Sequence, residues 1–262
     1  RDLHSFPTRR SSDLDIFNVM LPQFILAIFV IFMLILSMIL SPRMYKYAKS
    51  IAITGIAISI MSLSSVQTEP QYFALSNSIM SDSYTLLFDF VILFCGFLIA
   101  LISSNIIKTI KSNAYTYFAV LITALLGGIS VVSANDFLTL FISLELLSFP
   151  IYFMISVSKG YHSKEAAFKY LITSAVSTGV FLFGASYLYG ITGSINFSQI
   201  YEYINDTEAT LVYSISSIMI ILGIASKLAV FPFANWILDI YEGSATSIAA
   251  FISVIPKVAV LG

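Results

Sequence analysis

The sequence predicts an all-α membrane protein, a polytopic bundle of transmembrane helices. Hydrophobic residues make up 58% of the chain and charged residues only 10%, whereas about a quarter of the residues in a soluble domain are charged. The hydrophobic residues also gather in long runs. A membrane-spanning helix needs about 20 such residues to cross roughly 30 Å of hydrocarbon, and several of the runs reach that length.

Eight segments qualify, or nearly qualify, as membrane helices. In chain order they are residues 20–40, 50–66, 84–105, 114–133, 136–157, 165–190, 210–238 and 246–262. The seventh is too long for one straight crossing and contains Pro232, which should break or kink it. The eighth contains Pro256 and runs to Gly262. Between the sixth and the seventh, the stretch SINFSQIYEYI predicts either a short amphipathic interfacial helix or an ordinary surface turn.

Residues 1–14, RDLHSFPTRRSSDL, are expected to stand outside the fold. They are polar and basic, they lack the apolar core of a signal peptide, and they match the translation of a common sequencing-library adapter. The native chain is therefore expected to begin after Leu14. Because the eighth helix stops inside the membrane, residues 15–262 are expected to form a transmembrane domain truncated after about eight helices.

The loops alternate in charge. The first, third and fifth loops carry the basic residues Arg43, Lys46, Lys49, Lys108, Lys111, Lys159 and Lys164. The loops between them carry only the acidic residues Glu69, Asp82, Asp136, Glu202, Asp206 and Glu208. Since basic loops remain in the cytoplasm, the native N-terminus is predicted to lie outside. The connection after the seventh segment, with Asp239 and Glu242 and no basic residue, is the exception.

Composition excludes several classes of function. The net charge of −1 argues against a nucleic-acid partner. The single cysteine, Cys95, can form no internal disulfide and is interpreted as a small buried hydrophobic residue. The sequence contains no CxxC, HExxH or glycine-rich phosphate loop, so no redox cofactor, metal or nucleotide is expected in this chain.

Four ionisable residues lie well inside predicted helices: Glu145, Lys169, Lys227 and Lys257. Each costs roughly 2.5–3.5 kcal/mol at the centre of a membrane helix, which favours a functional role. Lys169 has an alternative, since it is close enough to the cytoplasmic end of its helix to extend to the interface. The alternative for Glu145 is a hydrogen bond between helices. Asp89, near the outer end of its helix, is predicted to be interfacial.

These four charges do not balance. Burial and repulsion between like charges both disfavour a charged lysine, so at least one lysine should be neutral part of the time. Such a lysine can carry a proton, with Glu145 as its counter-ion. Pro232 and Pro256 should each break its helix and leave backbone carbonyls free beside Lys227 and Lys257, where water could enter. The sequence therefore predicts half of a polar channel along the membrane plane.

Three stretches carry a resemblance to a known family: SANDFLTLFISLELLSFPIYFMI, SKEAAFKYLITSAVSTGVFLFGASYLYGITGS and SKLAVFPFANWILDIYEGSATSIAAFISVIPKVAVLG. From about Met20 to Gly262 the chain resembles the subunit N family of bacterial proton-pumping NADH:quinone oxidoreductase (complex I), the counterpart of mitochondrial subunit 2. EAAFKY, LYGITGS and DIYEGSAT favour subunit N over the sister antiporter-like subunits.

The resemblance implies an antiporter-like fold of fourteen helices built from two inverted five-helix repeats. This chain would contain the first repeat, with its broken seventh helix, and lack most of the second. The resemblance assigns proton translocation to Glu145, Lys169, Lys227 and Lys257. Many relatives read PFH after the break, where this chain has Ala234, so water would have to bridge the lysines of the seventh and eighth helices.

The resemblance also implies a division of labour within a translocase. This chain would move protons and hold no redox centre, while other subunits bind NADH, FMN, iron–sulfur clusters and quinone. The expected partners are the other membrane subunits of complex I and the lipid bilayer. The expected location is the bacterial plasma membrane, with the mitochondrial inner membrane as the alternative.

Three other interpretations stay open. The chain could be the homologous subunit of a cation/proton antiporter or of a membrane-bound hydrogenase complex, which share the buried charges. It could be a membrane enzyme acting on lipids, although the external acidic residues are scattered and have no histidine nearby. It could also be a structural scaffold, in which apolar residues could replace the four charges.

Overall fold

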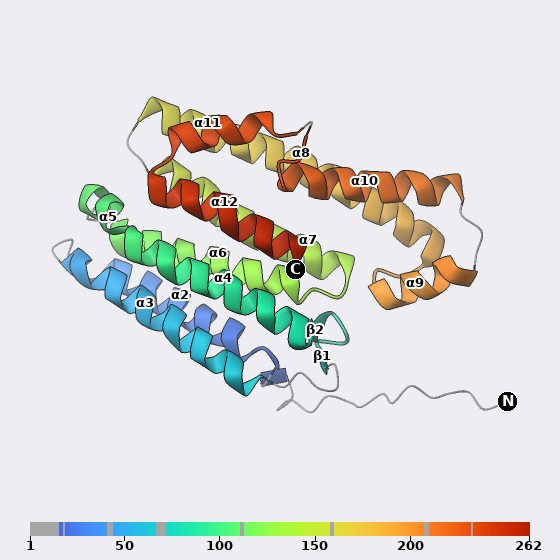
Figure 1. Ribbon diagram of the computed structural model, residues 1–262, viewed down its shortest axis with the longest axis horizontal. Helices are drawn as coiled ribbons and strands as arrows, with labels where there is room; N and C mark the ends of the chain where they lie inside the picture. The colour runs from blue at the N-terminus through green and yellow to red at the C-terminus, as the bar shows by residue number, and fades with distance from the viewer. Residues whose placement is uncertain are drawn as a thin grey trace.

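The computed structural model describes residues 16–17, 19–40, 44–66, 72–110, 113–157, 160–206, 210–231 and 233–262. The predicted all-α bundle is confirmed over these residues (Figure 1). Six helices are long and apolar enough to cross a membrane, and two shorter apolar helices accompany them. The six are α2 (Leu21–Ile39), α3 (Tyr45–Ser62), α4 (Ser83–Ile102), α6 (Ala114–Val132), α7 (Phe137–Ser156) and α8 (Tyr161–Thr192), and the shorter two are α10 (Leu211–Lys227) and α12 (Thr246–Leu261).

Each of the eight predicted segments overlaps one of these helices. The ends agree to within five residues except in the seventh segment, 210–238, where α10 already ends at Lys227. A short helix, α5 (Ser104–Ile110), follows α4. The stretch between the sixth and seventh segments forms α9 (Phe197–Asp206), so of the two alternatives the helix is the correct one. The expected leader, residues 1–14, lies outside the described residues.

Two acidic residues counted above as loop charges begin helices. The Oδ1 atom of Asp82 accepts a hydrogen bond of 2.8 Å from the backbone N–H of Thr85, and the Thr85 hydroxyl accepts one of 2.9 Å from the backbone N–H of Asp82. Asp136 caps α7 in the same way, at 2.7 Å from the backbone nitrogen of Thr139. Such caps satisfy backbone donors that have no partner inside the helix.

Helix α6 forms the core of the bundle. Its residues Tyr117, Phe118, Leu121 and Leu125 are fully buried, and α2, α3, α4, α7 and α12 all pack against it. Gly127 lets α7 approach closely, because a Cβ atom at this position would lie 2.4 Å from the backbone nitrogen of Leu147.

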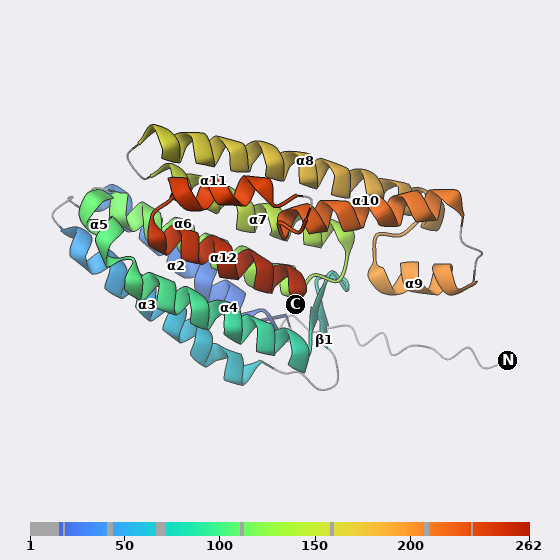
Figure 2. The ribbon, with the colours of Figure 1, turned by 45° about the horizontal axis from the view of Figure 1, so that its top comes forward.

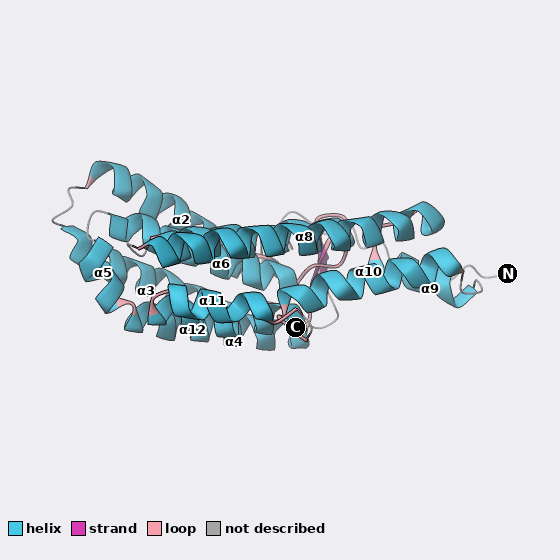
Figure 3. Ribbon diagram, turned by 90° about the horizontal axis from the view of Figure 1, so that it is seen from above, coloured by secondary structure: helices cyan, strands magenta, loops and turns pink. Residues whose placement is uncertain are grey.

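The other helices lie around this core. Helices α8 and α10 lie at one edge of the bundle and α2 and α3 at the opposite edge, as Figures 1 and 2 show. Seen from above, α2, α6 and α8 lie in one layer and α3, α4, α12 and α10 in another (Figure 3). Because α7 packs on both α6 and α8, it connects the core to the α8–α10 edge.

The predicted break of the seventh segment is confirmed. Helix α10 ends at Lys227, and α11 (Asn235–Gly243) follows after a short irregular connection. Ala229 in this connection has φ = 54°, a left-handed conformation that L-residues rarely adopt. Pro232 itself lies outside the described residues, but its missing N–H and its clash with the carbonyl four residues earlier explain why the helix stops near Leu228.

The prediction of a second break at Pro256 is wrong. Helix α12 continues through Pro256 to Leu261, and α7 likewise continues through Pro150. A proline inside a helix removes one backbone donor, so the carbonyl of Ile252 lacks the partner that residue 256 would supply. Packing holds α12 straight nonetheless, because Ile252, Ile255 and Pro256 are all buried.

The structure contains a small β-hairpin that was not predicted from the sequence. Strands β1 (Tyr72–Ala74) and β2 (Ile79–Ser81) pair antiparallel. The carbonyl of Asn77 in their turn accepts hydrogen bonds from the side-chain amides of Asn135, at 2.8 Å, and Asn196, at 3.3 Å. Phe197 N also donates to the Asn135 carbonyl at 3.2 Å. This loop staple, made by Asn77, Asn135 and Asn196, joins the hairpin, the α6–α7 connection and the α8–α9 connection at one end of the bundle.

Candidate functional site

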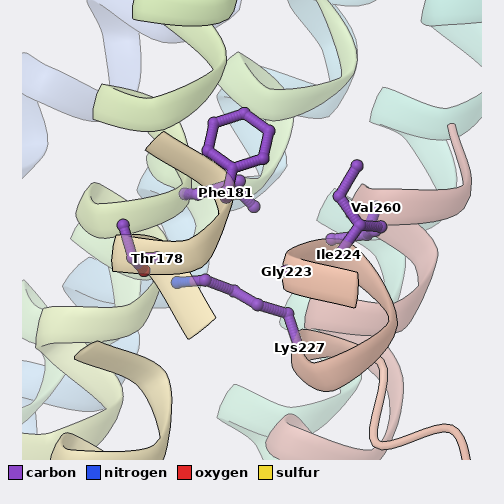
Figure 4. A pocket seen from close by; sticks show the side chains of 7 residues that line it. Thr178, Phe181, Gly223, Ile224, Lys227 and Val260 are labelled. Carbon is purple, nitrogen blue, oxygen red and sulfur yellow. The ribbon is translucent and has the colours of Figure 1, made fainter. Parts of the chain in front are cut away.

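Glu145 and Lys227 form an ion pair inside the bundle. The Lys227 Nζ atom lies 3.2 Å from Glu145 Oε1, with side-chain exposures of 9% and 18%. The same carboxylate oxygen accepts a hydrogen bond of 2.6 Å from the Thr178 hydroxyl. Lys227 extends from α10 toward Thr178 on α8, as Figure 4 shows. The structure therefore pairs two of the four predicted site residues.

Two serine hydroxyls complete the surroundings of the ammonium group. Lys227 Nζ donates to Ser174 Oγ at 3.1 Å and to Ser148 Oγ at 3.3 Å, in addition to Glu145. An ammonium group has three N–H donors, so each of them has an oxygen acceptor here. This arrangement compensates a buried charge that would otherwise be costly.

Helical spacing brings these side chains together. Ser148 follows Glu145 by one turn of α7, and Thr178 follows Ser174 by one turn of α8, so each pair lies on one face of its helix. Gly223 brings α10 close to α8, since a Cβ atom there would lie 2.9 Å from the Ser177 carbonyl oxygen.

The ion pair borders a small cavity. Its lining residues are Leu144, Thr178, Phe181, Gly223, Ile224, Lys227 and Val260 (Figure 4). The cavity has room for a single water molecule. Val260 is one helical turn from Lys257 on α12, so the cavity lies between the ion pair and the helix that carries the third predicted residue.

Lys257 itself stands apart from the pair. It is half-buried in α12, and it makes no hydrogen bond or ion pair with any residue that the structure describes. The structure thus places Lys257 near the site by its helix, without a direct contact to Glu145 or Lys227.

Lys169 also stands apart, in an ion pair of its own. Its Nζ atom lies 2.7 Å from Asp239 Oδ2 on α11 and 3.0 Å from Glu165 Oε1, one turn earlier on α8. The three side chains are between 41% and 49% exposed. This position agrees better with the alternative of a lysine near the helix end than with a lysine paired to Glu145. Asp239 was counted above in a connection that has no basic residue. In the structure it belongs to α11 and forms an ion pair with Lys169 of α8.

An aromatic cluster separates the two ion pairs along α8. The rings of Tyr170 and Trp236 stack with their centroids 5.1 Å apart, and Tyr152 meets Tyr170 edge-on at 4.9 Å. Trp236 belongs to α11 and Tyr152 to α7, so the cluster fixes α11 against both helices. The indole nitrogen of Trp236 is buried and donates to no described residue.

Sequence reasoning missed five polar residues of these two sites: Ser148, Glu165, Ser174, Thr178 and Asp239. A signal for three of them was present. The hydroxyl residues Ser174 and Thr178 lie four positions apart in an apolar helix, and Ser148 lies three positions after Glu145. Within the described residues, no three His, Cys, Asp or Glu side chains gather in a way that could hold a metal ion.

The chain is similar to known proteins. Residues 134–262 match a family described as NADH:quinone oxidoreductase/Mrp antiporter, TM. The chain is 34% identical over 249 residues to NADH-quinone oxidoreductase subunit N of Anoxybacillus flavithermus. The alignment covers 92% of this chain and 50% of the relative. The resemblance found in the sequence is thereby confirmed. The chain spans about half the length of the curated relatives it matches.

Two solved structures share the fold. A chain of respiratory complex I from Thermus thermophilus, with bound aureothin, aligns with a TM-score of 0.76 and 24% identity, over 92% of this chain and 51% of that one. A chain of the membrane-bound sulfane sulfur reductase, an archaeal respiratory membrane complex, aligns with a TM-score of 0.80 and 22% identity, over 95% of this chain and 52% of that one.

Proposed function

We propose that this chain, a homologue of NADH-quinone oxidoreductase subunit N, moves protons across a membrane as a subunit of that complex. The observation that carries the proposal is the buried pair of Lys227 and Glu145, 3.2 Å apart at the end of the broken helix α10. A buried ionisable pair in a membrane bundle is typical of proton and ion pathways.

The pair has two chemical states. With its proton, the Lys227 ammonium donates to Glu145, Ser148 and Ser174. Without it, the neutral amine no longer balances the carboxylate, which keeps its hydrogen bond from Thr178. Moving α10 relative to α7 would favour one state over the other, because it changes the distance between the two charges.

Lys257 is the proposed next carrier. The cavity beside Lys227 reaches Val260 on α12, one turn from Lys257, and a water molecule of the size it admits could pass a proton between the two lysines. Ala234 occupies the position where many relatives have a histidine, which leaves this step to water.

Lys169 and Asp239 give the connection between α10 and α11 a second attachment. Lys227 lies before this connection and Asp239 after it, so one ion pair holds the chain on each side of the connection. A shift of the connection would therefore alter both pairs together. For this reason we include Lys169 in the proposed pathway, as a residue whose ion pair with Asp239 changes when α11 moves.

The proposed division of labour follows the family. Other subunits would bind NADH, FMN, the iron–sulfur clusters and quinone, and this chain would contribute no cofactor site. Its partners would be the other membrane subunits of complex I and the lipid bilayer. Basic residues such as Lys49 and Lys108 support an orientation with their end of the bundle in the cytoplasm and the native N-terminus outside, in a bacterial plasma membrane.

A second candidate function is the same role in a cation/proton antiporter or a membrane-bound hydrogenase complex. The description of the matching family includes the Mrp antiporter, and a structure with the same fold belongs to the sulfane sulfur reductase. NADH-dependent pumping distinguishes the two candidates, since only the first couples proton movement to NADH oxidation.

The test is Glu145→Gln in the full-length protein within its complex, with Glu202→Gln on the exposed face of α9 as the matched control. Native electrophoresis checks assembly, and membrane vesicles report proton pumping and quinone reduction during NADH oxidation. We expect the Glu145 variant to assemble and to lose pumping and quinone reduction together, while the control keeps both. Unchanged pumping in the assembled Glu145 variant would overturn the proposal.

A further inference from the structure

Asp89 and Gln23 form a second buried polar site, far in sequence from the ion pair. The sequence predicts Asp89 at the membrane interface, but the structure buries it between helices, with only 5% of the residue exposed. Gln23 on α2 is 7% exposed. Both therefore face the interior at the end of the bundle that carries the β-hairpin.

Each residue has an oxygen without a hydrogen bond. Asp89 Oδ1 and Gln23 Oε1 are buried and accept no hydrogen bond from any residue that the structure describes. Buried polar atoms in proteins nearly always have a partner, so these two atoms indicate a missing donor.

One cavity is lined by both residues. Asp89 and Gln23 both line it, together with the small polar residues Ser81, Thr85 and Ser133. It has room for one water molecule. The hydroxyls of Thr85 and Ser133 already donate to the backbone carbonyls of Asp82 and Ile129, respectively. Toward the cavity their oxygens can therefore only accept a hydrogen bond.

None of the described residues that line the cavity is a counter-ion for the carboxylate. The titratable side chains on the helices that pack against α4 are Tyr45, Lys46, Tyr47 and Lys49 of α3, Lys108 of α5, Tyr115 and Tyr117 of α6, and Lys257 of α12. None of these residues lines the cavity. Lys49 instead donates to the Leu101 carbonyl and the Ser104 hydroxyl, at the opposite end of α4.

We propose that Asp89, Gln23 and one bound water form a proton-holding site, separate from Glu145 and Lys227. A proton adds to a carboxylate oxygen of Asp89, and the resulting O–H donates to the water. The water then donates to Gln23 Oε1 and to the Ser133 hydroxyl oxygen. This arrangement removes an uncompensated buried charge and gives both free oxygens a partner.

A metal cation fits the site less well. Helices α2 and α4 both begin at this end of the bundle, and the N-terminal ends of helices carry partial positive charge. That field opposes a further cation beside Gln23, which lies in the first turn of α2. The same field favours an ionised carboxylate, but it falls off within the first turn, and Asp89 is the seventh residue of α4.

Infrared spectroscopy of the full-length protein tests the proposal directly. The difference between wild type and Asp89→Asn at neutral pH should show the loss of one protonated carboxyl band, which shifts in D₂O. Asp82→Asn is the matched control, because Asp82 belongs to the same end of α4, where it caps the helix, and this variant should keep the band assigned to Asp89. Loss of ionised carboxylate bands from Asp89→Asn, with or without added Na⁺, would overturn the proposal.

A second variant tests the water bridge and does not alter Asp89. Gln23→Leu removes the acceptor on α2, so the Asp89 carboxyl band should move to higher frequency as its hydrogen bonding weakens. An unchanged band position in a folded Gln23→Leu protein would contradict the bridge. If Asp89→Asn fails to fold, the position of the Asp89 carboxyl band in Gln23→Leu still tests the proposal.

Discussion

Lys227 is the last residue of α10, and its ammonium group lies 3.2 Å from the Glu145 carboxylate on α7. The charged residue therefore stands where the helix ends and where the connection to α11 begins. A change in that connection can move Lys227 without unwinding α7 or α8, since neither helix is interrupted at this depth.

Removing one partner of the pair should destabilise the protein more than removing both. Lys227→Met leaves a buried carboxylate without its counter-ion, which costs about 3–5 kcal/mol. The double variant Lys227→Met with Glu145→Gln should recover much of this loss. Thermal unfolding of the purified full-length protein measures both variants, and equal stability of the single and double variants would contradict the pairing.

The Thr178 hydroxyl should matter through its hydrogen bond to Glu145. Thr178→Val keeps the shape of the side chain but removes the donor, and a hydrogen bond to a charged group contributes about 1.5–3 kcal/mol. If the transition state for proton transfer loses all of this free energy, we expect the pumping rate to fall by roughly 10- to 100-fold. Thr178→Ser, which keeps the hydroxyl, should retain most of the activity. A fully active Thr178→Val protein would show that the bond is dispensable.

Asp239→Asn should affect pumping without much effect on stability. The side chains of Asp239 and Lys169 are nearly half exposed, and Lys169 keeps Glu165 as a second partner, so the fold should tolerate the change. Pumping should fall, but less than in Glu145→Gln, because α11 loses one of its attachments to α8 and keeps the stack of Trp236 on Tyr170. Glu242→Gln on the same helix is the control, and equal pumping in the two variants would argue against the attachment.

Gly223→Ala should separate α10 from α8. A Cβ atom at Gly223 would lie 2.7 Å from the Cβ of Phe181 and 2.9 Å from the Ser177 carbonyl oxygen, so the helices must move apart. We expect a loss of about 1–3 kcal/mol in stability, as for other overpacked cores, together with weaker pumping. Gly190→Ala is the control, since a Cβ atom there meets nothing within 4 Å. Equal unfolding temperatures for the two variants would contradict this packing.

Sequence alone predicted the eight apolar helices and both residues of the buried ion pair, but not which lysine pairs with Glu145. Long apolar runs specify membrane helices almost without reference to tertiary structure, which explains why all eight segments were found. Glu145 and Lys227 were found because a charge in such a run is costly and therefore conspicuous. Their pairing depends on how three helices pack, which the spacing of residues along the chain does not determine.

The misses have physical causes as well. Asp239 was assigned to a loop, since the broken helix hides where α11 begins. The strands β1 and β2 span three residues each, too short for an alternating pattern to be recognised. Asp89 was placed at the interface because distance along a helix gives depth in the membrane but not burial between neighbours.

The loop staple formed by Asn77, Asn135 and Asn196 fixes one end of the bundle around a pivot. Helices α6, α7 and α8 meet this pivot at their ends, whereas Lys227 is at the end of α10 that points away from it. Helix α10 makes none of these three hydrogen bonds, so it can shift against α8 without breaking the staple. Such a shift would change the position of Lys227 relative to Glu145 and leave the stapled loops in place.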